Sequence, residues 1–249
     1  MYNLIISASS SVAAFLILWF SLPHDFRPWG IVVGLALLFG LNFFLSKRIM
    51  KKVEALMAQV TKELQNQKFE KAIRTLKNGY NLGDWQFFVK PQLESQIGSI
   101  YYLMRDEENA LMHLQKGFNK HWVAMGMLAI IYMKKKDKTK MVETFEKAVK
   151  STPKESLLWS LYAYCMLKEG DREKALEILS RGLKKLPEDD KLKANQTAVA
   201  NKERMKMKNY GEMWMQFFLE KSPAMGGQKV PHYMQALAQR GGGRRIIRR

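Results

Sequence analysis

The residues of this chain whose types and spacing could do chemistry are the basic side chains at its C-terminal end. Five arginines fall within the last ten residues, on a glycine-rich segment: Arg240, Arg244, Arg245, Arg248 and Arg249. Guanidinium groups bind phosphate through paired hydrogen bonds, so this pattern is typical of a site for anionic lipid headgroups or nucleic acid. The 249 residues carry a formal net charge of +18, which favours anionic partners in general. The tail is therefore a predicted anion-binding site.

Residue types that carry catalysis or bind metals are scattered along the chain. The four histidines, His24, His113, His121 and His232, have no partners at metal-ligand spacing. Cys165 is the only cysteine and lies in an apolar stretch, which is typical of a small buried side chain rather than a nucleophile. No glycine-rich phosphate-binding loop and no Ser-His-acid combination can be placed. We therefore expect a protein that is not an enzyme and that has no cofactor and no metal.

Two uncharged segments near the N-terminus predict a helical hairpin that spans a membrane. Residues 2–22 and 29–45 contain no charged side chain, and each is about as long as a helix must be to cross a bilayer. The connection, residues 23–28, begins and ends with proline and allows only a tight turn. Four cations follow the second segment directly: Lys47, Arg48, Lys51 and Lys52. The connection contains only one, Arg27. The positive-inside rule then places everything after residue 45 in the cytoplasm.

A cleaved signal peptide, which would export the rest of the chain, is the alternative to this hairpin. It is the weaker interpretation because the first residues contain no Lys or Arg and no small-residue cleavage site follows. We therefore expect a multi-pass protein of the bacterial inner membrane with its N- and C-termini in the cytoplasm. A eukaryotic organelle membrane also fits the hairpin, but it is the weaker interpretation because the sequence has no basic, Ser-rich transit segment.

Small and bulky side chains recur after the hairpin at fixed offsets. Four pairs of residues are 34 positions apart: Ala129 and Ala163, Phe145 and Leu179, Ala148 and Gly182, and Pro153 and Pro187. A small residue on one helix lets a second helix approach, and bulky side chains fill the angle between helix pairs. A period of this size is typical of solenoids built from paired helices.

Residues 53–187 resemble the tetratricopeptide repeat (TPR) family. The best copy, residues 156–189, reads Trp159-x2-Tyr162-Ala163 and then Ala175-x3-Leu179-x2-Gly182-x4-Pro187. Earlier copies keep fewer of these positions, and the first is degenerate. The plan of a two-span hairpin followed by repeats is also similar to HemY-type inner-membrane proteins, in architecture only. The resemblance implies an all-α fold, a transmembrane helical hairpin followed by a TPR α-solenoid of antiparallel helix pairs.

We expect four regions along the chain. These are a transmembrane hairpin (1–46), a solenoid of about four units (47–189), C-terminal capping helices (190–222) and a disordered basic tail (223–249). Because no Gly or Pro lies between Gly40 and Gly79, the second span is expected to continue as one helix to about Asn66.

The capping region is expected to begin with a helix over residues 191–208. Trp214, Phe217 and Phe218 follow it and are expected to seal the last repeat. Contact of this basic, aromatic region with the membrane surface is the alternative.

The inner face of such an array is lined by the first helix of each unit, so its side chains predict what is bound. The groove is expected to comprise Gln92, Ser95, Ser99, Tyr102, Val123, Gly126, Ile130, Met133, Lys134, Leu157, Ser160, Tyr164, Leu167 and Lys168. Most are apolar, lysines lie at one end, and the asparagines of the family's carboxylate clamp are missing. If the face assignment is shifted by one residue, some of these side chains belong to the core instead. An apolar peptide or helix with an acidic end is the predicted partner.

The sequence thus predicts a membrane-anchored TPR scaffold that binds a protein partner at the cytoplasmic face of the inner membrane. The alternative is that the arginine-rich tail binds anionic lipid or nucleic acid, with the repeats as a spacer. An enzyme ranks third, because the sequence shows no titratable pair in a pocket.

Overall fold

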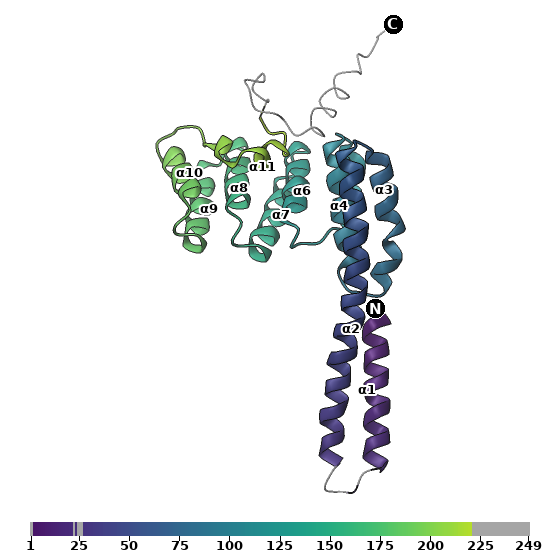
Figure 1. The fold of residues 1–249 in the computed structure, drawn as a ribbon. Helices are drawn as coiled ribbons and strands as arrows, with labels where there is room; N and C mark the ends of the chain where they lie inside the picture. Colours follow the sequence, from purple (N-terminus) through teal and green to yellow (C-terminus); the bar gives the residue numbers. More distant parts are fainter. Residues whose placement is uncertain (1, 22, 24–26, 221–249) are drawn as a thin grey trace. The chain divides into compact units, whose positions relative to one another are not determined.

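The computed structural model describes residues 2–21, 23 and 27–220, and the regular elements in those ranges are all helical (Figure 1). Two compact units make up the chain, residues 1–93 and residues 94–249. The prediction of an all-α chain, with an apolar helical hairpin before TPR-type helix pairs, is confirmed.

The first unit contains a long helical hairpin followed by shorter helical elements. Its elements are α1 (Tyr2–Ser21), α2 (Arg27–Gln65), α3 (Phe69–Asn78), the 3-10 helix η2 (Tyr80–Asp84) and the start of α4 (Val89–Leu103). Both α1 and the Pro28–Gln65 part of α2 are long and apolar enough to cross a membrane, and each contains an 18-residue stretch with a mean hydropathy of 2.0. The 39 residues of α2 form one helix, which agrees with the expected continuous rod.

Small residues let α1 and α2 pack closely. Ser11 Oγ donates a 2.6 Å hydrogen bond to the Gly34 carbonyl, and a Cβ on Gly34 would lie 3.4 Å from that hydroxyl. The outer faces of both helices remain apolar and exposed, with Phe20 and Phe39 among the most exposed side chains. A helix pair with small residues between its members and large apolar side chains outside has the surface that lipid favours.

The second unit is a stack of helix pairs. It comprises the rest of α4, α5 (Glu107–Leu114), α6 (Trp122–Lys134), α7 (Lys138–Ser151), α8 (Ser156–Lys168), α9 (Arg172–Lys185), α10 (Asp190–Ala200), the 3-10 helix η3 (Met207–Tyr210) and α11 (Glu212–Met215). Helix α6 packs against α7 and α8 against α9, and α10 covers both α8 and α9. The repeat positions Ala129, Ala163, Phe145 and Leu179 are fully buried, as their role in the pattern requires.

The same turn joins the two helices of each pair. The turns contain a residue of positive φ followed by an aspartate: Arg105–Asp106, Lys136–Asp137 and Gly170–Asp171. Each aspartate caps the next helix, because its carboxylate accepts a hydrogen bond from the backbone N–H three residues on. Backbone bonds that cross each turn close a Schellman motif at the end of the first helix. Residues within the turn therefore determine how the second helix of each pair leaves the first.

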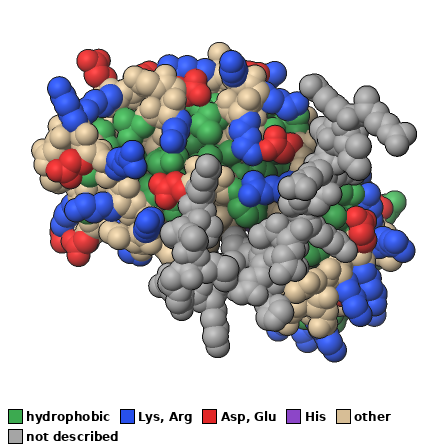
Figure 2. All heavy atoms as spheres, turned by 90° about the horizontal axis from the view of Figure 1, so that it is seen from above, with side chains coloured by type: hydrophobic (Ala, Val, Ile, Leu, Met, Phe, Trp, Pro, Cys, Tyr) green, Lys and Arg blue, Asp and Glu red, His purple; other side chains and the backbone are tan. Residues whose placement is uncertain are grey.

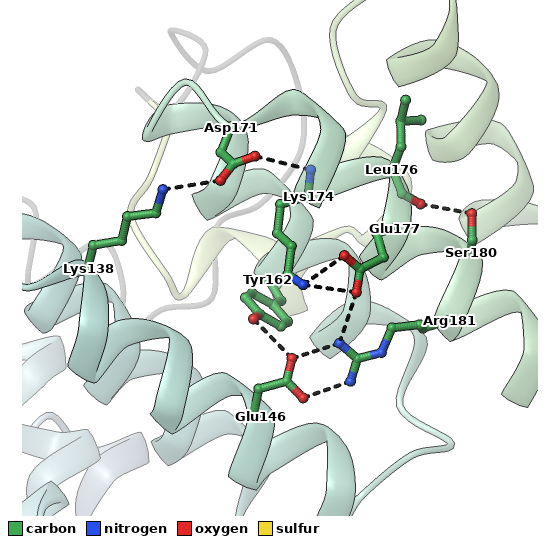
Figure 3. Close-up of polar contacts among 9 residues, drawn as sticks. All are labelled: Lys138, Glu146, Tyr162, Asp171, Lys174, Leu176, Glu177, Ser180 and Arg181. Carbon is green, nitrogen blue, oxygen red and sulfur yellow. Dashed lines mark hydrogen bonds and ion pairs between the residues drawn. The ribbon is translucent and has the colours of Figure 1, made fainter.

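One carboxylate ties three helices of successive pairs together (Figure 3). Glu146 on α7 accepts two hydrogen bonds of 2.7 Å from the Arg181 guanidinium on α9. The Tyr162 hydroxyl on α8 donates a third, at 3.1 Å. The hydrogen bonds from Arg181 hold the pKa of Glu146 below its usual range, although burial opposes them. The contact therefore joins neighbouring repeats.

Replacing Glu146 with Gln should destabilise the fold by about 1 kcal/mol at neutral pH, because this partly exposed pair is screened by solvent. The folded-state pKa of Glu146 is depressed, so its contribution is fully present above the unfolded pKa of about 4.3 and is lost as the pH falls through the folded-state value. Urea unfolding of wild type and variant, followed by circular dichroism, should show their difference shrinking in acid. Glu177→Gln is the control, since Glu177 is more exposed and 3.8 Å from Arg181. A difference that persists at low pH would contradict the ion pair.

Candidate functional site

The chain reverses direction after α10. The expected helix over residues 191–208 ends at Ala200, because Lys202 has a φ of 62° and the Glu203 N–H donates to the Ala198 carbonyl. Residues 201–220, the C-terminal segment, then continue as an irregular chain with η3 and α11. Gly211, at φ 60° and ψ −137°, makes the turn between these two, a conformation that suits glycine alone.

Aromatic side chains of the C-terminal segment lie on the first helices of the repeats. Trp214 meets the Tyr164 ring of α8 edge-on, with ring centroids 4.9 Å apart. Phe217 lies 6.4 Å from the Trp122 ring of α6, and a Cβ on Gly126 would come within 3.1 Å of the Phe217 ring. Both Trp214 and Phe217 are fully buried. They do not seal the end of the last repeat as expected, because the reversal after α10 carries them back over α8 and α6.

Tyr102 of α4 holds the far end of the C-terminal segment. Its hydroxyl donates a 2.7 Å hydrogen bond to the Phe217 carbonyl, and its ring stacks on Phe218 with centroids 6.1 Å apart. The Arg105 guanidinium lies 3.5 Å from the centroid of the Phe218 ring on which it sits. Burial raises the pKa of Tyr102, so its hydroxyl stays protonated as a donor.

A buried polar cluster holds the near end of the segment against α8. The Tyr210 hydroxyl lies within hydrogen-bond distance of Ser156 and Ser160, at 2.8 and 2.9 Å. Asn195 of α10 donates to Ser160 Oγ at 3.1 Å and accepts from the Lys206 N–H at 2.7 Å. A buried amide satisfied on both sides fixes the path of the chain between α10 and η3.

The predicted groove residues fall into four groups. Tyr102, Gly126, Ser160 and Tyr164 lie against the C-terminal segment. Ser95, Ile130 and Leu157 are buried, Gln92, Ser99, Val123, Met133 and Leu167 are half-buried, and Lys134 and Lys168 are exposed. Gln92 belongs to the first unit and all the others to the second.

The groove prediction is wrong for the residues that the fold closes off. Ser95 accepts a 2.7 Å hydrogen bond from the Phe118 N–H, and Ile130 and Leu157 belong to the hydrophobic core. For these three, the alternative of a core position holds. Tyr102 and Ser160 are covered by the chain's own C-terminal segment, so a partner would meet that segment first. Tyr164 packs on Trp214 of that segment and also lines the pocket described next.

A pocket of about 900 Å³ remains beside the end of α8. Its walls are Tyr164, Leu167 and Lys168 from α8, together with residues 203–209, 219 and 220 of the C-terminal segment. The Lys168 ammonium lies 5.3 Å from the centroid of the Tyr164 ring. These three residues of the predicted groove therefore line this open site.

The pocket combines apolar walls with an excess of cations. Leu167, Met205, Met207 and Leu219 supply apolar surface. Its charged side chains are Lys168, Arg204, Lys206 and Lys208 against Glu203 and Glu220. On the face shown in Figure 2, hydrophobic side chains gather in the middle, and Lys and Arg side chains lie around them together with some Asp and Glu. Such a site suits an apolar ligand that carries negative charge.

The titratable groups nearest to this site do not form a reactive set. Burial raises the pKa of the Cys165 thiol, so it remains an unreactive core side chain. Burial likewise raises the pKa of Tyr164 to about 12. His113 Nδ1 lies 2.6 Å from Glu94 in a buried pair, but the pair packs between α4 and α5 and does not line the pocket. Among the described residues, no group of acidic, His and Cys side chains could hold a metal ion.

The predicted anion-binding site lies outside the described residues. This applies to each of its arginines: Arg240, Arg244, Arg245, Arg248 and Arg249. The described pocket contains other cations, including Lys168 and Arg204. Lys168 was among the predicted groove residues, and Arg204 was not.

Comparisons with known proteins match most of the helical repeats. A family model described as ChAPs (Chs5p-Arf1p-binding proteins) matches residues 55–214. Among solved structures, a chain described as "MamA RS-1 ArsTM double mutant" is 15% identical, with a TM-score of 0.45, and the match covers 78% of this chain and 98% of that one. No curated protein matches the chain.

Proposed function

This chain belongs to the ChAPs (Chs5p-Arf1p-binding proteins) family, and we propose that it acts as a membrane-anchored scaffold whose TPR-type repeats bind a protein partner. The family description names its members as binders of other proteins, which supports a binding role over a catalytic one. The partner of this chain is proposed from its own surface, because a family name does not transfer a particular partner.

The observation that carries the proposal is the pocket at the end of α8. It is open, and both apolar side chains and the cations Lys168 and Arg204 line it. An apolar peptide or helix would bury its side chains against Leu167 and Met205, and an acidic end would meet these cations. The C-terminal segment forms one wall, so the binding site comprises two parts of the chain that are distant in sequence.

Substitutions at the pocket should release the partner without unfolding the protein. Leu167→Ala and Lys168→Glu should each weaken binding by roughly ten-fold or more, as expected at the centre of an interface. Partners captured by affinity purification of the full chain from its native membranes would be compared across variants, and the affinity of each would then be measured directly.

Lys147→Glu is the matched control for these variants. Lys147 is exposed on α7, away from the residues that line the pocket, and its reversal changes the net charge equally. A partner that all three variants retain, or that all three lose, would contradict binding at this pocket.

The anchor of the proposed scaffold is the α1–α2 hairpin. Its length and hydropathy support two spans, and the cations that follow residue 45 support cytoplasmic termini at a bacterial inner membrane. The full chain should remain in the membrane pellet after extraction with alkaline carbonate, which strips peripheral proteins. Release into the supernatant would contradict the proposed spans.

Binding of lipid or nucleic acid by the arginine-rich tail is the less favoured function. Its support is the composition of residues 240–249 alone, whereas the protein-binding proposal draws on the family match and on the pocket.

A further inference from the structure

Three large aromatic side chains are exposed together in the first unit. The turn after η2 reads Trp85-Gln86-Phe87-Phe88 and is here called the aromatic turn. Trp85 is 39% exposed, Phe87 45% and Phe88 58%. Soluble surfaces rarely group side chains of this size, and such groups mark contacts with other molecules or with membranes.

The aromatic turn is fixed against the N-terminal end of α1. The backbone N–H of Asn3 donates to the Trp85 carbonyl at 3.4 Å, and the Asn3 side-chain amide donates to Gln86 Oε1 at 3.2 Å. The Tyr2 and Trp85 rings meet edge-on with centroids 5.3 Å apart. Asn3 is buried by these contacts, so the turn covers the helix end that would otherwise expose its backbone N–H groups.

The same turn is also fixed to α2, at the residue where the apolar run stops. Ser46 Oγ donates a 2.9 Å hydrogen bond to Gln86 Oε1, and the uncharged run of α2 ends at Leu45. That run, residues 29–45, is about 26 Å long at 1.5 Å per residue, close to the thickness of a bilayer core. Gln86 therefore lies at the ends of both apolar helices.

The charges around the turn favour an anionic surface. Lys47, Arg48, Lys51 and Lys52 are all exposed on the part of α2 that follows Ser46. Near the aromatic turn, Lys90 adds a cation and Asp84 an acid, and both are exposed. Aromatic rings with cations beside them are the composition of protein surfaces that sit among phospholipid headgroups.

We propose that the aromatic turn binds the phospholipid headgroup layer as a third membrane contact, in addition to the two spans. This inference rests on the proposed insertion of α1 and α2. Trp85, Phe87 and Phe88 enter the interface, and the exposed cations of α2 meet anionic headgroups just above it. The contact then restricts how far the first unit can tilt relative to the bilayer.

The test places a fluorescent reporter at three depths in the full chain, reconstituted into phosphatidylcholine vesicles with and without phosphatidylglycerol. Phe87→Cys, Phe39→Cys and Gln65→Cys are each labelled with an environment-sensitive dye. The wild-type chain serves as the labelling control, because Cys165 is buried. Phe39 is exposed within the apolar part of α2, and Gln65 is exposed about 30 Å beyond Leu45 along the helix.

The expected result is that nitroxide on the lipid headgroup quenches most of the fluorescence at position 87, nitroxide on the acyl chain quenches position 39, and neither quenches position 65. Quenching at 39 without quenching at 87 would overturn the inference and leave the membrane spans standing. Protection of position 87 from aqueous iodide without lipid quenching would also overturn it, because a protein or a second copy would then cover the turn. No quenching at position 39 would overturn the spans themselves.

Discussion

Truncating Phe217 to alanine should lower the free energy of unfolding by about 3–5 kcal/mol, the cost of removing a fully buried aromatic ring. The Phe217 side chain is completely inaccessible and lies among Trp122, Trp214 and Gly126. Its loss would leave a cavity between α6 and the C-terminal segment that the rigid helix cannot close. Guanidinium unfolding of the full chain in detergent, followed by circular dichroism, measures the change.

Met213→Ala is the control for this variant, because Met213 lies in the same segment and is 49% exposed. It should change the free energy of unfolding by less than about 0.5 kcal/mol. If Phe217→Ala costs no more than Met213→Ala, the C-terminal segment does not pack on the inner helices, and the pocket that it walls would not form. The same variant therefore also tests the geometry behind the proposed binding site.

The second large effect is expected at Trp159. This side chain is buried against α9, its indole N–H donates a 2.9 Å hydrogen bond to the Pro153 carbonyl, and Gly182 lies against its ring. Trp159→Ala should cost about 3–5 kcal/mol. Gly182→Ala should cost about 1–3 kcal/mol, because its new Cβ would lie 2.9–3.1 Å from ring atoms of Trp159.

The double variant separates this contact from a general loss of stability. Once Trp159 is alanine, the new methyl group at position 182 meets no ring, although it still lies 3.0 Å from the Cβ that alanine keeps at position 159. Gly182→Ala should then cost less than it does in the wild type, which gives a coupling energy of about 0.5–3 kcal/mol by unfolding measurements on the four proteins. If the unfolding free-energy costs of the two single variants simply add in the double variant, the packing of Trp159 on Gly182 is contradicted.

Features that depend on local periodicity could be predicted from the sequence. The repeat spacing places Ala129, Ala163 and Leu179 in the core, and the absence of Gly and Pro predicts one continuous α2. The starts of three helices also have a local sequence signal. Asp106, Asp137 and Asp171 each precede a helix by one residue, which is the expected position of an N-cap.

The site could be predicted only in part, because many of its residues belong to the C-terminal segment, which is distant in sequence from the repeat helices that it contacts. The hydrogen bond from Tyr102 to Phe217 joins residues 115 positions apart. The spacing of the aromatic residues in 214–218 fits packing on the end of the last repeat and packing on the inner helices equally well. Only the Schellman turn at Lys202, which reverses the chain, decides between the two positions. A lysine in such a turn has no strong sequence signature. Tyr164, Leu167 and Lys168 were identified, whereas Arg204 and Met205 were missed as pocket residues.

The unbroken α2 has a consequence for how a partner is found. With the hairpin in a bilayer, as proposed, the twenty residues after Leu45 hold the start of α3 at a standoff of about 30 Å from the lipid. A disordered tether of the same length would let it range out to about 70 Å. Lengthening α2 by four residues after Leu45 would raise the start of α3 by about 6 Å and turn it by about 40°. A membrane-bound protein that contacts the start of α3 would then meet it at a fixed height above the lipid, so its search is close to two-dimensional.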